Sequence, residues 1–82
     1  MKKEKTGFAA FDKASGKGLN VVFGFSTYTY LTDDPDKVHL DASEKQLQMY
    51  CNWYNKGHKN QKEFEIKEVV LVTEIRPVKV ED

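Results

Sequence analysis

The sequence lacks the features by which several protein classes are recognised. Its 82 residues hold a single cysteine, Cys51, so no internal disulfide can form and nothing indicates an oxidising compartment. No apolar run approaches the roughly 20 residues of a membrane span, and the charged start, residues 1–5, precedes no apolar stretch of signal-peptide length. We therefore expect a soluble, cytoplasmic protein with no membrane partner.

The sequence also has no excess of charge of either sign. Lys plus Arg number 13 and Asp plus Glu number 13, which gives a formal net charge of zero. Nucleic-acid binding through phosphates requires surplus cations that displace counterions, so this balance does not favour it. Lysines gather in residues 1–20 and 56–62, whereas aspartates gather in residues 33–44. Such a dipolar surface favours docking to a charged partner of complementary shape.

The length of the chain predicts one domain, residues 1–82, with residues 1–6 disordered because they are polar and charged. A domain of this size buries only about 60–65% of the surface that its unfolded chain exposes. An enclosed substrate cavity would have to be cut from a thin core, so we expect a protein that is not an enzyme.

Alternating apolar residues predict β-strands at residues 8–11, 19–31 and 63–80. Residues 8–11 are expected to form the first strand of a hairpin whose turn contains Gly16 and Gly18, although a single helical turn is the alternative. Gly24 marks a bend or bulge in the second strand, and Pro77 bends the third or confines it to an edge.

A helix is predicted over residues 43–56. Ser43 with Gln46 has the spacing of a capping box, as has Asp41 with Glu44, and Gly57 suits a left-handed cap at the end. The inward stripe has helical spacing and consists of Leu47, Tyr50, Cys51 and Tyr54. The predicted fold class is α+β: a small β-β-α-β domain with a three- or four-stranded, mainly antiparallel sheet and one helix packed on one face. A third strand beside the second would be parallel to it, and beside the first would be antiparallel.

The residues that could carry catalysis are few. Cys51 and His58 are seven positions apart, which on a helix separates them by about 10 Å, and Gly57 ends the helix before His58. Cys51 is therefore expected to be a core residue. His39 lies near Asp36 and Asp41, where an acid–base pair is conceivable, but we expect a surface histidine in an acidic loop.

The motifs for metal and phosphate binding are incomplete. Asp33, Asp34, Asp36 and Asp41 do not match a calcium-binding loop, because the sixth and twelfth positions from Asp34 are His and Lys. Residues 15–18 lack the first glycine of a phosphate loop and its Ser or Thr after the lysine. We expect no metal and no cofactor.

The most informative feature is apolar surface that one helix on a small sheet cannot cover. Met49 and Trp53 widen the helical stripe, Tyr28 and Tyr30 lie on the strand face opposite Phe23, and residues 69–72 are apolar on both faces. Uncovered patches with these residue types are typical of interaction surfaces. We predict that Trp53, Met49, Tyr28 and Tyr30 bind another protein or a second copy in a homodimer.

The alternative function is nucleic-acid binding. The basic loop at residues 56–62 offers Lys56, Lys59 and Lys62 as phosphate contacts, and Tyr28 and Tyr30 could stack on bases beside it. No motif of an RNA-binding sheet accompanies these residues. We therefore expect weak nucleic-acid binding at best.

In composition the chain resembles the small accessory proteins of bacteriophages and prophages in low-GC Gram-positive hosts, which are short, rich in Lys and Asn and without a catalytic signature. The resemblance rests on no motif and assigns no residue a role. It implies a non-enzymatic module that inhibits or modulates a host or defence protein.

Overall fold

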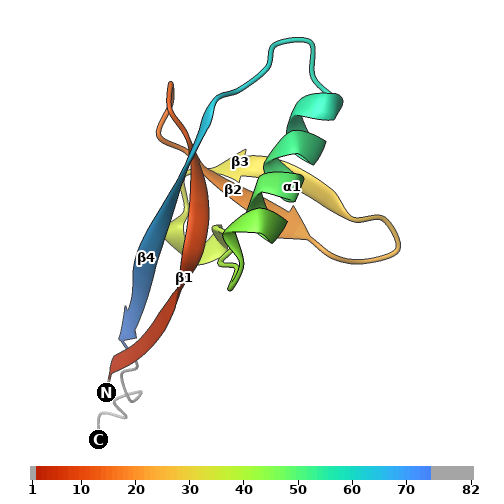
Figure 1. Cartoon of the computed structure of the whole chain (residues 1–82). Helices are drawn as coiled ribbons and strands as arrows, with labels where there is room; N and C mark the ends of the chain where they lie inside the picture. The colour runs from red at the N-terminus through yellow and green to blue at the C-terminus, as the bar shows by residue number, and fades with distance from the viewer. Residues whose placement is uncertain (1, 75–82) are drawn as a thin grey trace, which may run out of the picture.

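The computed structural model describes residues 2–74 as a four-stranded antiparallel open sheet with one helix, in the sheet order β3-β2-β1-β4 (Figure 1). The α+β class and the single helix on one face are confirmed. The last strand lies beside the first and is antiparallel to it, which decides between the two arrangements that the sequence left open.

The longest feature is a ribbon of two strands, β1 (Lys2–Asp12) and β4 (Phe64–Glu74). They pair without interruption from Lys2↔Glu74 to Asp12↔Phe64. Residues 2–6 therefore lie in a strand, whereas the sequence predicted disorder there. Their polar composition showed only that they are not core residues, and pairing with β4 holds them in the sheet. The predicted continuation to residue 80, with Pro77, lies outside the described residues.

The predicted single strand over residues 19–31 is instead a hairpin of β2 (Gly18–Val22) and β3 (Tyr28–Thr32). Leu19 pairs with Leu31 and Val22 with Tyr28. In this register an odd-numbered residue always lies opposite another odd-numbered residue, so the alternation continues unchanged through the turn. Periodicity therefore identified the buried face correctly and could not detect the reversal of direction.

β1 and β2 separate soon after their turn, and a later segment fills the gap. Their register contains the pair Phe11↔Gly18. Beyond it, His39 N–H donates to Leu19 C=O at 3.0 Å, and Phe8 and Asp41 exchange two backbone hydrogen bonds of 2.8 and 2.9 Å. Residues 38–41, which follow the short helix η1 (Pro35–Lys37), thus lie between the two strands.

The helix α1 (Glu44–Lys56) begins as its sequence predicts. Ser43 is the N-cap, and its hydroxyl accepts a hydrogen bond from Gln46 N–H at 3.2 Å. Gly57 ends the helix with φ −90° and not in the predicted left-handed conformation. The amide side chain of Asn55 supplies part of the termination, because it bonds both backbone groups of Lys62 at 2.8 and 2.9 Å.

The core lies between α1 and one face of the sheet. The predicted stripe of the helix is buried, and it meets alternate residues of β1 and β2; the buried cluster is Ala10, Leu19, Val21, Leu47, Tyr50, Cys51 and Tyr54. Phe64 and Ile66 of β4 pack against this cluster. Within residues 2–74, no helix is both long enough and apolar enough to cross a bilayer.

Candidate protein-binding surface

One side of the helix and the β2–β3 loop together form an aromatic surface, which we define as Phe23, Met49, Tyr50 and Trp53. Tyr50 is its base: the ring is buried and stacks on Trp53 with centroids 6.4 Å apart and planes at 24°. Phe23, at the start of the loop, meets Tyr50 edge-on at 6.0 Å. The surface therefore joins two elements that are distant in sequence.

The outer members of this surface remain accessible to solvent. Trp53 is 46% exposed, Met49 50% and Phe23 60%. Met49 and Trp53 line a shallow depression on the helix together with Asn52 and Lys56. Trp53 thus has a stacked partner on one side and open solvent on the other. This placement fits an anchor residue better than a core residue.

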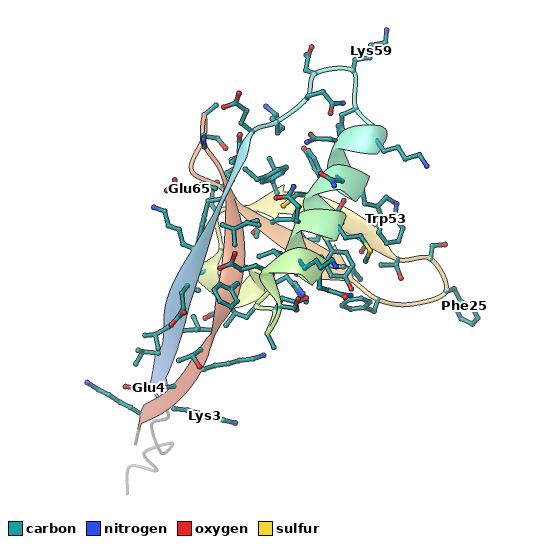
Figure 2. The ribbon with its side chains drawn as sticks, in the orientation of Figure 1. Lys3, Glu4, Phe25, Trp53, Lys59 and Glu65 are labelled. Atoms are coloured by element: carbon teal, nitrogen blue, oxygen red, sulfur yellow. The ribbon has the colours of Figure 1, made fainter. Side chains whose placement is uncertain are left out.

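The loop between β2 and β3, residues 23–27, carries a second exposed aromatic residue. Phe25 is fully exposed and projects outward from the loop, as Figure 2 shows. This loop contains no charged residue. Sequence reasoning missed both phenylalanines as surface residues, because their alternation matched that of the buried strand residues.

His39 and Asp41 support the aromatic surface from below. The imidazole Nε2 lies 3.0 Å from Asp41 Oδ2, and the histidine ring packs edge-on against Tyr50 at 5.5 Å and Phe23 at 5.9 Å. The His39 side chain is only 17% exposed, so the expectation of a surface histidine is wrong. The reason is the insertion of residues 38–41 between β1 and β2, which no local pattern reveals.

The Asp41 carboxylate also orients the chain as it enters the helix. Its Oδ1 accepts a hydrogen bond from Ser43 N–H at 3.0 Å. Burial opposes ionisation, but the hydrogen bonds from His39 and from the Ser43 amide outweigh it and hold the pKa of Asp41 below its usual value. His39 and Asp41 therefore fix the geometry on which the aromatic surface rests.

The structure divides the four predicted protein-binding residues between two faces. Trp53 and Met49 lie on the helix, whereas Tyr28 and Tyr30 lie on the sheet face opposite it, because their neighbour Leu31 points into the core. The two tyrosine rings lie 6.2 Å apart, and the Tyr30 hydroxyl accepts a hydrogen bond from Asn20 Nδ2 at 2.9 Å. They form a second, separate patch.

The basic loop lies at the end of α1 and does not share a surface with these tyrosines. Lys56 and Lys59 are exposed, with Lys59 at the outer end of the loop (Figure 2). Lys62 is partly buried and close enough to Asp12 to influence its ionisation. The three predicted phosphate contacts therefore do not form one platform with Tyr28 and Tyr30.

Cys51 is a core residue, as predicted. Its side chain is 1% exposed, and burial raises the pKa of the thiol to about 11. His58 stacks on Tyr54 with centroids 4.1 Å apart and lies beyond the end of the helix. Neither the thiol's environment nor this stacking resembles an activated nucleophile.

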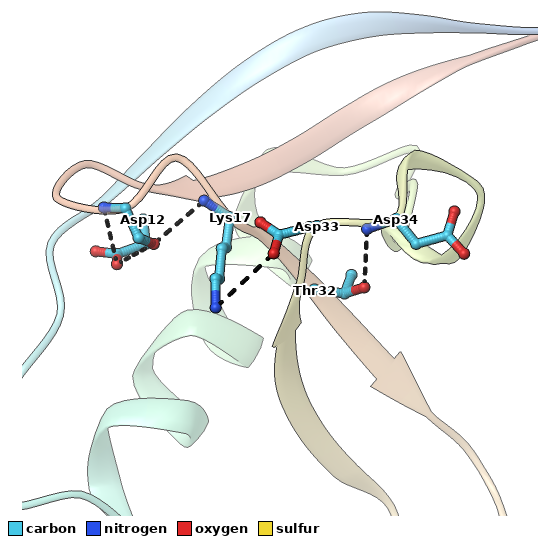
Figure 3. A network of polar contacts seen from close by, with 6 residues as sticks. Asp12, Lys17, Thr32, Asp33 and Asp34 are labelled. Atoms are coloured by element: carbon cyan, nitrogen blue, oxygen red, sulfur yellow. Dashed lines mark hydrogen bonds and ion pairs between the residues drawn. The ribbon is translucent and has the colours of Figure 1, made fainter.

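Residues 15–18, compared above with a phosphate loop, and residues 33–36, compared with a calcium-binding loop, lie at turns (Figure 3). Asp12 accepts hydrogen bonds from the Ser15 hydroxyl at 2.7 Å and the Ser15 amide at 3.3 Å, and Gly16 has φ 77°. Lys17 pairs with Asp33 at 3.9 Å across the exposed surface. In residues 2–74, no group of three or more His, Cys, Asp or Glu side chains could hold a metal ion.

A further feature that sequence reasoning missed is a cavity on the sheet face opposite the helix. It has a volume of about 300 Å³, and its walls are mainly apolar; they include Ala9, Phe11, Val38, Leu40, Val69 and Leu71. The sequence predicted apolar surface that one helix on a small sheet leaves uncovered. Residues 33–40 nevertheless cover part of it, since Val38 packs against Gly18. The apolar run at residues 69–72 was the available signal.

Comparison with protein-family models, with curated proteins and with solved structures finds no match for this chain.

Proposed function

We propose that this protein is a non-enzymatic binding module that docks the aromatic surface onto another protein. The observation that supports this most strongly is Trp53, which is held by stacking on buried Tyr50 and yet is 46% exposed. A pre-positioned tryptophan loses little conformational entropy on binding, and tryptophan is among the residues most enriched at binding hot spots.

The charges around the surface indicate the chemistry of the partner. Lys45 and Lys56 are exposed near the two ends of the same helical side, and Gln48 and Asn52 between them are uncharged. The complementary partner is a protein that has an apolar pocket flanked by carboxylates. The compositional resemblance to phage accessory proteins supports a host or defence protein in this role, with inhibition as the result.

The experiment compares Trp53→Ala with Tyr28→Ala. Tyr28 is a matched control, because it is an aromatic residue of similar exposure, 54%, on the opposite face. Proteins captured from the source cell by the immobilised wild-type chain are identified, and the affinity of each purified candidate is measured. We expect Trp53→Ala to lower the affinity for the specific partner by at least about 30-fold, whereas Tyr28→Ala leaves the affinity unchanged.

Two further results complete this test. Trp53→Ala should remain folded with little change in melting temperature, and Lys45→Glu with Lys56→Glu should weaken the complex and reduce its salt dependence. If Trp53→Ala is unfolded, the residue belongs to the core and the proposal fails. It also fails if both alanine variants bind the captured protein as tightly as the wild type does.

A further inference from the structure

The outer edge of β4 presents unpaired backbone groups in the described part of the chain, because β4 ends the sheet. Phe8 fixes which groups these are. Its N–H and C=O bond to Asp41 and so point away from β4. Residues opposite each other in an antiparallel pair share this orientation, so Glu68, opposite Phe8, points its own groups outward. Val70 and Val72 follow at the same spacing.

Between Glu68 and Glu74, this edge carries none of the devices that protect edges. Charged side chains, proline and bulges normally prevent an exposed strand from pairing with another chain. β4 contains no proline, its pairing with β1 has no bulge, and residues 69–72 are all apolar. Val70 is 53% exposed and Val72 49%, on the same face as the helix but beyond its reach.

The cavity described above lies beside the same edge on the other face. Its walls include Val69 and Leu71 of β4 together with Val38 and Leu40. A strand added at the edge would place alternate side chains over this cavity while its backbone bonds to β4. An edge that provides main-chain partners and an adjoining pocket for side chains is the arrangement of strand-addition sites.

We propose that the outer edge of β4 pairs antiparallel with β4 of a second copy, about a two-fold axis at Val70. In this register Val70 faces Val70 of the second copy on the helix side, and Val69 faces Leu71 on the cavity side. Glu68 faces Val72, so no like charges are opposed. With the axis at Lys67 or at Glu68, that residue would face the same charge in the second copy. With the axis at Val69, Glu68 would face Val70 and Lys67 would face Leu71, so both charges would lie opposite apolar residues.

The second copy is favoured over an unrelated peptide because the run at residues 69–72 complements itself. Outward backbone groups at Val70 meet outward groups at the same residue, so Val70 forms a hydrogen-bonded pair with itself across the two-fold axis. The resulting sheet has both helices on one face, since the axis is perpendicular to the sheet. The dimer therefore presents two aromatic surfaces in the same direction, and the edge does not use Trp53 or Phe23.

Val70 faces itself across the axis, which permits a charge-swap test. The mass of the full chain is measured by light scattering over a concentration series for Val70→Lys, Val70→Glu and the uncharged control Val70→Thr. We expect a wild-type dimer, and for each charged variant a dissociation constant raised by at least about tenfold. An equimolar mixture of the two charged variants should recover the dimer, and Val70→Thr should keep it.

Several outcomes would overturn the proposal. If the wild-type chain stays monomeric up to about 1 mM, the outer edge of β4 does not pair with a second copy. Dimers of Val70→Lys as tight as those of the wild type place the interface elsewhere. A mixture that remains monomeric excludes an axis at Val70.

Hydrogen exchange on the wild-type chain tests the same interface without relying on a variant that folds. The amides of Glu68, Val70 and Val72 should exchange more slowly as protein concentration rises, while those of Val69 and Leu71, which face β1, should not change. Equal concentration dependence in both sets overturns the edge pairing. Because Trp53→Ala leaves β4 intact, failure of this dimer and failure of the proposed partner binding are distinguishable.

Discussion

The two halves of this molecule are held together by different means. Where α1 covers the sheet, the side chains meet in a core, and the largest ones that are almost fully buried are Leu19, Leu47, Cys51 and Asp12. In the outer half of the β1–β4 ribbon the side chains are mostly exposed, and backbone pairing from Lys2↔Glu74 to Gly7↔Val69 maintains the structure. One half depends on burial and the other on hydrogen bonds between strands.

This difference explains why the candidate surfaces lie where they do. The helical half has enough core to hold Tyr50 rigid, and so it can support an exposed Trp53 above the core. The ribbon has no such core, and a two-stranded ribbon alone is only marginally stable in water. A further strand at its edge would stabilise it, which is the physical basis for the proposed dimer.

The largest expected effect is a loss of folding stability, and it should differ between a core residue and a ribbon residue. Leu47→Ala removes a fully buried side chain and should lower the free energy of unfolding by about 2–5 kcal/mol. Val72→Ala, at a half-exposed position of the ribbon, should cost less than about 1 kcal/mol. Urea denaturation of both variants at low protein concentration measures the difference, and equal losses would contradict the division into two halves.

The next effect concerns residues 38–41, the segment inserted between β1 and β2. A methyl group added at Gly18 would meet the side chain of Val38, so Gly18→Ala should destabilise the protein by about 1–3 kcal/mol. Gly24→Ala is the control, because the nearest atom to its added methyl group lies 4.0 Å away. Thermal melting compares them, and similar curves would show that Val38 yields easily.

Cys51 should have a smaller effect within the core. Cys51→Ala removes one sulfur from the packed stripe and should cost about 1–2 kcal/mol. Burial raises the pKa of this thiol to about 11, so a maleimide should label it slowly in the native protein and quickly in denaturant. Rapid labelling of the native chain would contradict the core placement.

The smallest effect should come from the turn at Asp12. The hydrogen bond from the Ser15 hydroxyl is the main reason that the pKa of Asp12 is lowered from 3.8; the Ala14 amide and Lys62 add to it, against the opposing effect of burial. A carboxyl group with a depressed pKa in the folded state contributes stability above its unfolded pKa. That contribution should be lost as the pH falls below about 5.

Asp12→Asn should reduce this acid sensitivity without abolishing it, because the pKa of Asp41 is also lowered. Melting temperatures from neutral pH to acid measure the effect. The wild-type and variant curves should converge as the pH falls, and parallel curves would show that Asp12 ionisation does not stabilise the turn.

The helix could be predicted almost to the residue, because its signals are local. Ser43 caps the start through Gln46, and the stripe from Leu47 to Tyr54 is buried as its spacing predicted. The end at Gly57 was also located correctly, although its conformation was not, since the side chain of Asn55 bonds to Lys62 and shapes the turn.

The candidate surfaces were predicted only in part. Composition identified Trp53 and Met49 as surplus apolar residues, and both are exposed on the helix. Alternation placed Tyr28 and Tyr30 on the strand face opposite Phe23, but it could not reveal that Phe23 is exposed and joins Tyr50. Which residues share a surface depends on how strands and loops are arranged, and alternation along one strand does not contain that information.

The sequence by itself determined the α+β class, the helix from its cap to its end, and the face that the residues of β2 and β3 present, because these depend on neighbours within a few positions. The tertiary structure decided the reversal between β2 and β3, the place of β4 beside β1, and the insertion of residues 38–41 between β1 and β2. Those three features join segments that are distant in sequence. Their stability comes from backbone pairing and packing that exist only once the chain has folded.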